Sequence, residues 1–463
     1  MKQICHSRRK EAFAAAKAMM ISMKLPAEFL ARMKTMLGEE YDAFLACMEQ
    51  PLVKGVRLNP LKCDWDTLEK SLPVSLAPTP FSPLCRYAPG LEKPGLLPAH
   101  HAGMFYSQEP SASSAVTALD PRPVEKILDL CAAPGGKSTQ IAGLLQGEGL
   151  LWANEIVRGR ANILLSNLER MGAKNAVVSS CHPQKLCETL QGWFDRVLVD
   201  APCSGEGMFR RDETAVNEWT PESPGACAQR QQSILDSAAL AVKEGGVLVY
   251  STCTFSREEN EDTVSAFLQR HPEFELVPVE ADFGRPALDG SFARRIFPMD
   301  GGEGHFVAKF FRSGENPCLV RPFSAKAPKE TVELAKQLYQ ELLSDELTEP
   351  IALFGGSVLL LPEKMPRPEG LGVLRAGVEL GELRGKRIEP AHGLFMSRAK
   401  EVCRRALDFA PDDPALLAFL KGEEIDCAES GYTAVCVNGV VTGFGKASNG
   451  RLKNHYPKGL RNY

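Results

Sequence analysis

From Val124 to Phe311 the sequence alternates between short apolar runs and segments whose apolar residues have helical spacing. Such alternation predicts strand–helix–strand units, in which parallel strands form one sheet and helices cover both of its faces. Ligands bind beyond the carboxyl ends of the strands in that architecture. We therefore expect an α/β doubly wound, mostly parallel sheet with strands at Val124–Leu130, Leu150–Ala153, Ala176–Ser179, Arg196–Val199, Val247–Ser251 and His305–Phe311, and helices at Lys137–Leu145, Arg158–Met171, Gln229–Val242 and Glu258–Arg270.

The chain has 463 residues, which is too long for one compact core. Pro26–Met48 has helical spacing and Lys54–Lys62 has the pattern of a strand, so a small α/β unit is expected before the sheet. Ser313–Lys329 is rich in Pro, Ser and Gly, which predicts a linker. The expected units are an extension at residues 1–25, an N-terminal α/β domain at 26–98, the doubly wound domain at 99–312, the linker at 313–329 and a C-terminal α+β domain at 330–463.

The first residues superficially resemble a signal peptide, because Arg8, Arg9 and Lys10 precede an Ala/Met stretch. Lys17 interrupts that stretch and no small-residue cleavage site follows, which favours a helical extension or a start codon assigned too early. No apolar run approaches the roughly 20 residues of a membrane helix. The 14 cysteines include no CxxC pair, so we expect a cytoplasmic protein with reduced thiols, no bound metal and no membrane contact.

A glycine turn connects the first expected strand of the sheet to its helix, in the sequence Asp129-Leu-Cys-Ala-Ala-Pro-Gly-Gly-Lys-Ser138. Gly135 and Gly136 allow a ligand to approach the backbone, and the helix start offers unpaired N–H groups and a positive dipole end. The spacing fits neither the dinucleotide pattern GxGxxG nor a P-loop. Glu155 follows the second strand, where a carboxylate can bind the hydroxyl pair of a ribose; the alternative is a carboxylate that only initiates a helix.

Two further motifs end consecutive strands, Val199-Asp-Ala-Pro-Cys-Ser-Gly-Glu206 and Tyr250-Ser-Thr-Cys-Thr-Phe255. Cys203 and Cys253 therefore occupy equivalent loops at the edge of the sheet where ligands bind. A cysteine is most often a buried structural residue, and this interpretation is preferred for Cys131. Cys203 and Cys253 lie in Pro/Gly and Ser/Thr loops instead of apolar runs, which favours a chemical role for both.

In order and spacing, these three motifs resemble the signatures of the Sun-domain (nucleolar-protein/Sun) family of RNA 5-methylcytosine methyltransferases. Tyr106-Ser-Gln-Glu-Pro-Ser111 is similar to the family's entry to its catalytic domain. The short N-terminal domain and the tail Lys453-Asn-His-Tyr-Pro-Lys-Gly-Leu-Arg461 look most like the bacterial RsmF-type enzymes of small-subunit ribosomal RNA. The resemblance implies a Rossmann-like methyltransferase domain that uses S-adenosylmethionine, followed by a PUA-like RNA-binding domain.

The resemblance also implies roles for individual residues. Cys253 is expected to attack carbon 6 of a cytosine, and Cys203 to help remove the carbon 5 proton and release the product. Asp200 is expected to bind the cytosine edge, while Lys137 favours the thiolate. His182 stands where family members commonly have an Asp that contacts the adenine side of the cofactor. The implied S-adenosylmethionine site comprises Ala132, Ala133, Pro134, Gly135, Gly136, Lys137, Glu155, Arg160 and Asp200.

The net charge of −4 is unusual for an RNA-binding protein, but the charges are unevenly distributed. Ser430–Tyr463 contains no acidic residue and is expected to face RNA phosphates, with a solvated tail as the alternative. We expect a monomer whose partner is small-subunit ribosomal RNA or the assembling 30S subunit. The cations of this segment are Lys446, Arg451, Lys453, Lys458 and Arg461, and the rings expected to stack on bases are Phe444, His455 and Tyr456.

Three alternatives have to be weighed against this reading. The first is a different substrate, transfer RNA. A DNA cytosine methyltransferase has its nucleophile in a Pro-Cys after the fourth strand, and the second cysteine, Cys253, argues against that class. An RNA-binding assembly factor with little activity is disfavoured because Cys203, Cys253, Asp200 and Lys137 are all present.

Overall fold

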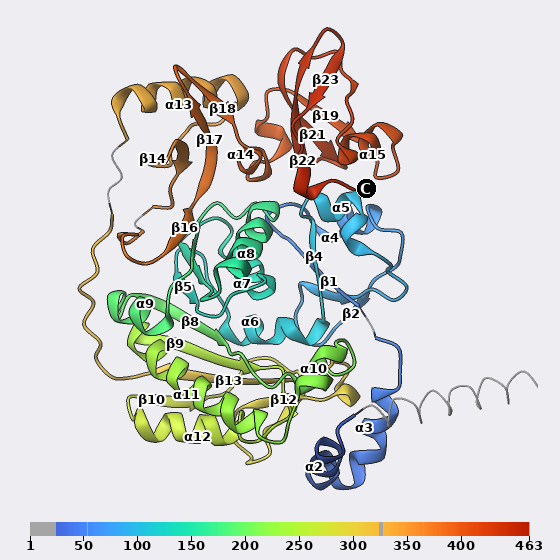
Figure 1. Cartoon of the computed structure of the whole chain (residues 1–463), viewed down its shortest axis with the longest axis vertical. Helices are drawn as coiled ribbons and strands as arrows, with labels where there is room; N and C mark the ends of the chain where they lie inside the picture. The colour runs from blue at the N-terminus through green and yellow to red at the C-terminus, as the bar shows by residue number, and fades with distance from the viewer. Residues whose placement is uncertain (1–24, 53, 324–326, 364, 463) are drawn as a thin grey trace, which may run out of the picture.

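The structure is a computed structural model that describes residues 25–52, 54–323, 327–363 and 365–462. Its largest element is a ten-stranded sheet (Figure 1). The strands are β5 (Lys126–Asp129), β6 (Leu150–Asn154), β7 (Ala176–Ser179), β8 (Phe194–Asp200), β9 (Val242–Thr252), β10 (Phe274–Val277), β11 (Arg285–Pro286), β12 (Arg294–Ile296), β13 (His305–Arg312) and β16 (Val373–Ala376). Their order is β11-β12-β13-β9-β8-β5-β6-β7-β16, with β10 paired to β13 outside this path. The inner strands β7, β6, β5, β8 and β9 are parallel, which confirms the predicted doubly wound fold.

Helices cover both faces of the sheet. Successive residues of a strand point to opposite faces, so the apolar residues of these strands need a cover on each side. Ile127 packs into one core cluster and its neighbour Leu128 into the other. The predicted helices are all present. One face is covered by α6 (Ser114–Leu119), α7 (Gly136–Leu145) and α8 (Arg158–Arg170), and the other by α9 (Pro183–Thr189), α11 (Ser223–Ala241) and α12 (Glu261–Arg270).

The outer strands depart from the parallel pattern. The strand predicted at His305–Phe311 exists as β13, but it runs antiparallel to β9. β12 and β13 are also antiparallel, because residues 297–304 alone connect them and parallel neighbours need a crossover of a dozen or more residues. At the opposite edge, β16 comes from the last third of the chain and pairs antiparallel with β7, so that the sheet contains a strand from beyond the expected linker.

The N-terminal region has two parts. The helices α2 (Ala27–Leu37) and α3 (Tyr41–Met48) pack Phe29 and Phe44 against Phe209, Trp219 and Phe255 of the large domain. A separate sheet follows in the order β2-β3-β1-β4. Its strands are β1 (Gly55–Leu58), β2 (Ala77–Pro78), β3 (Cys85–Tyr87) and β4 (Phe105–Gln108). The expected extension at residues 1–25 lies outside the described residues except for Leu25.

The last third of the chain contains two further sheets. The first has the order β14-β15-β17-β18 and the second β19-β21-β22-β23-β20. Their strands are β14 (Ile351–Phe354), β15 (Ser357–Leu360), β17 (Val378–Arg384), β18 (Arg387–Pro390), β19 (Ala406–Phe409), β20 (Ile425–Asp426), β21 (Gly431–Val437), β22 (Val440–Ser448) and β23 (Arg451–Asn454). The accompanying helices are α13 (Lys329–Leu342), α14 (His392–Met396) and α15 (Pro414–Lys421).

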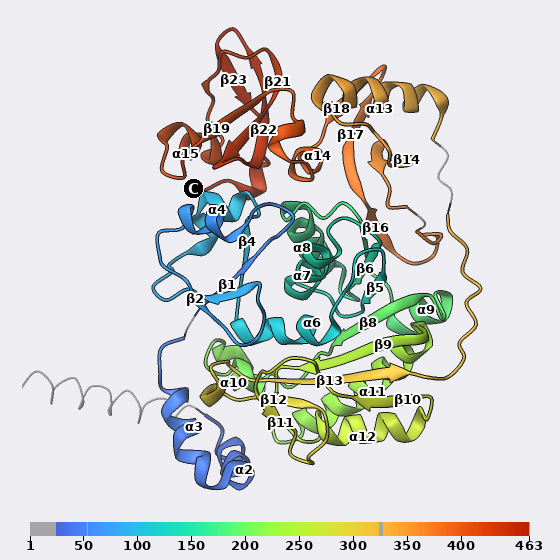
Figure 2. The same ribbon diagram turned by 180° about the vertical axis from the view of Figure 1, so that it is seen from behind.

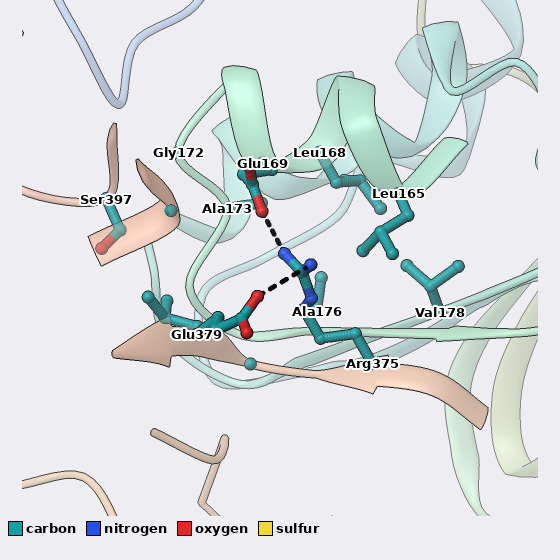
Figure 3. Close-up of a pocket in the computed structure, with 13 residues that line it drawn as sticks. Leu165, Leu168, Glu169, Gly172, Ala173, Ala176, Val178, Arg375, Glu379 and Ser397 are labelled. Carbon is teal, nitrogen blue, oxygen red and sulfur yellow. Dashed lines mark hydrogen bonds and ion pairs between the residues drawn. The ribbon is translucent and has the colours of Figure 1, made fainter. Parts of the chain in front are cut away.

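Both C-terminal sheets are anchored to the rest of the molecule. Arg375 of β16 binds Glu169 of α8 and Glu379 of β17 beside a pocket at the domain junction (Figure 3). The second C-terminal sheet lies beside the N-terminal region (Figure 2), and Val56 of β1 and Val435 of β21 belong to one apolar cluster. None of the helices in the described part of the chain has both the length and the apolar character that a bilayer crossing requires.

Candidate active site

The glycine loop (residues 130–135) leaves β5 and leads into α7. Gly135 has a φ of +113°, a conformation that other residues rarely adopt. Arg57 of β1 reaches this loop from the N-terminal sheet, donating one hydrogen bond to the Gly136 carbonyl and another, of 2.6 Å, to Thr139 Oγ1. Burial lowers the pKa of Arg57 to about 10, still far above neutrality. No local pattern in the sequence predicts this contact, which fixes the start of α7 to the N-terminal domain.

Asp129 lies at the carboxyl end of β5 and is completely buried. Its Oδ2 accepts a hydrogen bond of 2.6 Å from Ser138 Oγ, while Oδ1 has no partner among the described residues. Burial raises the pKa of Asp129 to about 7. A buried acceptor without a donor is costly, so this oxygen fits a ligand that brings an N–H group, such as the ammonium of S-adenosylmethionine.

Glu155 follows β6 and is only 3% exposed. It accepts a hydrogen bond of 2.9 Å from the Val157 N–H and lies 3.2 Å from Arg160. Arg160 also donates to the Ala133 carbonyl at 3.0 Å. The structure thus brings the predicted residues Glu155, Arg160 and Ala133 together at the ends of β5 and β6, where they could line a cofactor site.

His182 is exposed and stands at the start of α9, just beyond β7. The loop before it is held by the last third of the chain, because the Ser180 N–H donates to the Gly372 carbonyl at 2.9 Å. A Cβ atom on Gly372 would lie 2.3 Å from the Ser180 carbonyl oxygen, which leaves room only for glycine. The segment before β16 therefore shapes the loop that carries His182, a contact without any local signal in the sequence.

Lys137 and Asp200 form an ion pair of 2.7 Å between the first turn of α7 and the end of β8. Burial alone lowers the pKa of Lys137, but the Asp200 carboxylate outweighs this effect and keeps the pKa above its ordinary value. Ser251 Oγ donates to the other Asp200 oxygen at 2.7 Å. Lys137 is therefore a permanent cation beside the loops that carry the cysteines.

Cys203 and Cys253 meet between the loops after β8 and β9, with their Sγ atoms 3.2 Å apart. The hydrogen bond to Cys253, together with burial, raises the pKa of Cys203 well above its ordinary value. The Gly207 N–H donates to the Cys253 carbonyl at 2.9 Å, and a Cβ atom on Gly207 would lie 3.0 Å from that oxygen. The two thiols, which lie fifty residues apart in the sequence, share one site.

Glu206 is a fully buried carboxylate in the loop after Cys203. It accepts hydrogen bonds of 3.1 Å from the Phe255 N–H and from Trp219 Nε1, and it pairs with Arg32 of α2. Glu206 therefore connects both cysteine loops to the N-terminal helices. Within the described ranges, no cluster of His, Cys, Asp or Glu is suited to hold a metal ion.

The five C-terminal cations do not form one surface. Arg451 is paired with Asp426 at 2.5 Å, and Arg461 donates to the Tyr456 carbonyl. Lys446 and Lys453 lie directly opposite each other on β22 and β23, and both are exposed. Among the described residues, these two of the five cations share one sheet face without an acidic partner, and Lys458 is exposed in the turn after β23.

The stacking prediction is wrong for two of the three rings. Phe444 and Tyr456 are each 2% exposed and belong to apolar core clusters, so they cannot stack on bases. His455 is exposed, and the Lys446 ammonium lies 5.0 Å from the ring centre of Tyr432. Phe444 lies in the buried part of β22 and Tyr456 follows β23, and both rings fill core clusters of the domain.

Four family models match successive segments of the chain. They are the N-terminal domain of 16S rRNA methyltransferase RsmF at residues 25–110, 16S rRNA methyltransferase RsmB/F at 116–311, the RsmF rRNA methyltransferase first C-terminal domain at 337–397, and the methyltransferase RsmF PUA domain at 406–462. The matches follow the separate sheets of the structure, including the division of the last third into two.

One relative is similar over nearly the whole length of the chain, and two solved structures are similar over part of it. Ribosomal RNA small subunit methyltransferase F of Vibrio vulnificus is 33% identical over 461 residues, which cover 94% of this chain and 97% of that protein. A methyltransferase homologue from Pyrococcus horikoshii matches with a TM-score of 0.56 and 29% identity, covering 65% of this chain and 98% of that one. NSun6 from Pyrococcus horikoshii with SFG has a TM-score of 0.57 at 24% identity, covers 63% of this chain and 99% of its own, and supports the fold.

Proposed function

The chain belongs to the family of ribosomal RNA small subunit methyltransferase F, and from this membership we propose that it methylates carbon 5 of a cytidine in 16S ribosomal RNA. The observation that supports the carbon 5 chemistry is the pair of thiols 3.2 Å apart at the carboxyl ends of β8 and β9. Carbon 5 of cytosine is a poor nucleophile. Addition of a thiolate to carbon 6 activates it, so a cysteine is the group that this reaction requires.

Cys253 is the nucleophile in this proposal. Its thiolate adds to carbon 6, and the enamine-like ring then takes the methyl group at carbon 5. Lys137 provides a fixed positive charge that favours the thiolate form at the site. Asp200, held between Lys137 and Ser251, faces the cytosine edge and favours the protonated adduct at ring nitrogen 3. Cys203 assists when the carbon 5 proton is lost and Cys253 leaves.

S-adenosylmethionine supplies the methyl group as an activated sulfonium. The residues proposed to hold it are Ala132, Ala133, Pro134, Gly135, Gly136, Lys137, Glu155, Arg160 and Asp200, to which the structure adds Asp129 through its unpaired oxygen. Glu155 binds the ribose hydroxyls, and the helix start of α7 offers N–H groups to the polar end. His182 takes the place of an acidic residue on the adenine side.

A base inside a duplex cannot be reached, so the target cytidine has to be single-stranded or flipped out of its helix. The PUA domain and the N-terminal domain flank the catalytic domain and are suited to hold RNA by its backbone. We propose that the substrate is small-subunit ribosomal RNA, free or in the assembling 30S subunit, and that the protein acts on it as a cytoplasmic monomer.

Bisulfite sequencing of ribosomal and transfer RNA tests this proposal, because 5-methylcytidine resists conversion. In a strain that lacks the gene, a cytidine of 16S ribosomal RNA should become convertible, and the wild-type gene should restore its resistance. The Cys253→Ala gene should fail to restore it. A cytidine lost only from transfer RNA, or an unchanged conversion pattern, would overturn the proposed substrate.

A further inference from the structure

Glu259 is a completely buried carboxylate between the two cysteine loops and α12. One oxygen accepts hydrogen bonds of 2.9 Å from the Ser204 N–H and from Gln231 Nε2, and the other accepts one from Ser204 Oγ. Each of these groups donates to the carboxylate, which favours its ionised form, whereas burial acts in the opposite direction and raises the pKa of Glu259 above its ordinary value. Glu259 touches neither thiol, and the mechanism proposed above does not use it.

The contacts of Glu259 run to the immediate neighbours of both cysteines. Ser204 follows Cys203, and its Oγ lies 2.9 Å from Oγ1 of Thr254, which follows Cys253. Gln231 of α11 donates to the Pro202 carbonyl at 3.0 Å as well as to Glu259. The residues on both sides of Cys203 are thus held by one network, which is anchored on a carboxylate in the interior.

We propose that Glu259 is a positioning residue, which keeps Cys203 within hydrogen-bond distance of Cys253 so that Cys203 can act in release of the methylated base. The inference rests on the proposed function. It names the residue that holds Cys203 in the place that this function requires. Without the carboxylate, Ser204 loses two hydrogen bonds and the loop after β8 is free to shift. A misplacement of about 1 Å in a catalytic group costs about 100-fold in rate.

Release breaks two bonds of the base. The carbon 5 proton passes to water, and the electron pair of its bond forms the double bond between carbons 5 and 6. The bond between carbon 6 and Cys253 breaks, its electron pair returns to sulfur, and that sulfur takes the proton of the Cys203 thiol. Cys203 then regains a proton from water. The hydrogen bond to Cys253 and burial raise the pKa of Cys203, and the Glu259 charge adds a smaller contribution, so Cys203 starts this step protonated.

The test measures methyl transfer and protein–RNA adducts that survive SDS, with 16S ribosomal RNA or 30S subunits from a strain lacking the gene as substrate. Cys203→Ala sets the adduct level reached when release is blocked. Glu259→Ala should lower turnover by about 10- to 100-fold and raise the adduct fraction toward that level. Ser204→Ala, which keeps the Ser204 N–H bond, should show the same change more weakly. Glu259→Gln should restore part of the turnover because it keeps an acceptor.

Asp262→Asn is the matched control, because Asp262 is an exposed acid that follows Glu259 closely, in the first turn of α12, and within the described residues its side chain pairs with Arg257 alone. This variant should match the wild type in turnover and in adduct fraction. Melting temperature and S-adenosylmethionine affinity show whether each variant is folded, and Ser204→Ala decides the matter if Glu259→Ala does not fold. A folded variant with lower turnover and no adduct increase, while Cys203→Ala accumulates adduct, would overturn the positioning role. Turnover by Cys253→Ala would instead overturn the proposed function itself.

Discussion

The cysteine loops and the β22–β23 hairpin are both rich in polar residues, yet they are built in opposite ways. Around Cys203 and Cys253, buried carboxylates take several hydrogen bonds each from neighbouring loops. On the hairpin, Lys446 faces Lys453 across two strands in open solvent. The first arrangement fixes atoms for chemistry. The second leaves charge unneutralised, at some cost in stability, which suits a surface that meets an anionic partner.

The largest expected effect falls on the first region. Cys253→Ala should lower methyl transfer by about three orders of magnitude or more, because alanine has no nucleophile and the raised pKa of the neighbouring Cys203 keeps that thiol protonated. S-adenosylmethionine affinity, measured by calorimetry, should change less than about twofold, since Cys253 and the glycine loop follow different strands, β9 and β5. Cys318→Ala, which changes an exposed cysteine outside the site, is the control. Substantial turnover by the Cys253 variant would remove the thiol from the reaction.

A change at Glu155 tests cofactor binding without changing either thiol. Glu155→Ala should weaken S-adenosylmethionine binding by about 1.5–3 kcal/mol, the range for a hydrogen bond that involves a charged group. The dissociation constant then increases by roughly 10- to 150-fold. Glu148→Ala changes an exposed acid near the other end of β6 and should leave binding as it is. Equal affinities for both variants would place the ribose contact elsewhere.

Because of Asp129, the affinity for S-adenosylmethionine should depend on pH, whereas RNA binding by the hairpin should not. Its pKa is raised to about 7, so near pH 6 the free carboxyl is mostly protonated. A cationic ligand lowers that pKa on binding, and binding then releases a proton. S-adenosylmethionine affinity should therefore increase by about tenfold from pH 6 to pH 8 and level off above pH 7.

Asp129→Asn should abolish this pH dependence, because its amide does not titrate. Titrations at pH 6, 7 and 8 in one buffer series provide the measurement. The proposed contact with the ammonium would fail if the pH dependence remained in the variant.

The sequence identified the groups that carry chemistry but not the groups that hold them. Lys137, Asp200, Cys203 and Cys253 stand in motifs at strand ends, and the rule for parallel sheets brings such ends to one edge. Glu259 stands near Cys253 in the sequence, but nothing local shows that it turns toward Ser204. Such partners are set by loop paths, which neither periodicity nor composition specifies.

In the C-terminal domain, the number of charged residues in a segment does not show which charges stay unneutralised. The acid-free segment from Ser430 onward was expected to act as one patch, but Arg451 reaches back to Asp426, outside that segment. Pairing between strands decides which charges are neutralised, and the strand register is not visible in composition. The same limit applies to β16, since no linker pattern predicts that a strand will join a sheet formed earlier in the chain.

The smallest expected effect lies on the hairpin and distinguishes its charges from one another. Lys453→Gln should weaken RNA binding severalfold and reduce the slope of log affinity against log salt by about 0.7–0.9, because one phosphate contact and its released counterion are lost. Arg451→Gln is the matched control, since Asp426 already neutralises Arg451. The Lys453 variant should also unfold at the same or a slightly higher temperature, because it removes a like-charge pair worth about 0.2–1 kcal/mol. Weaker binding at unchanged or higher stability cannot come from damage to the fold. If the folded Lys453 variant keeps the wild-type salt slope, RNA does not contact this face, and the exposed pair is a solvated feature of the domain surface.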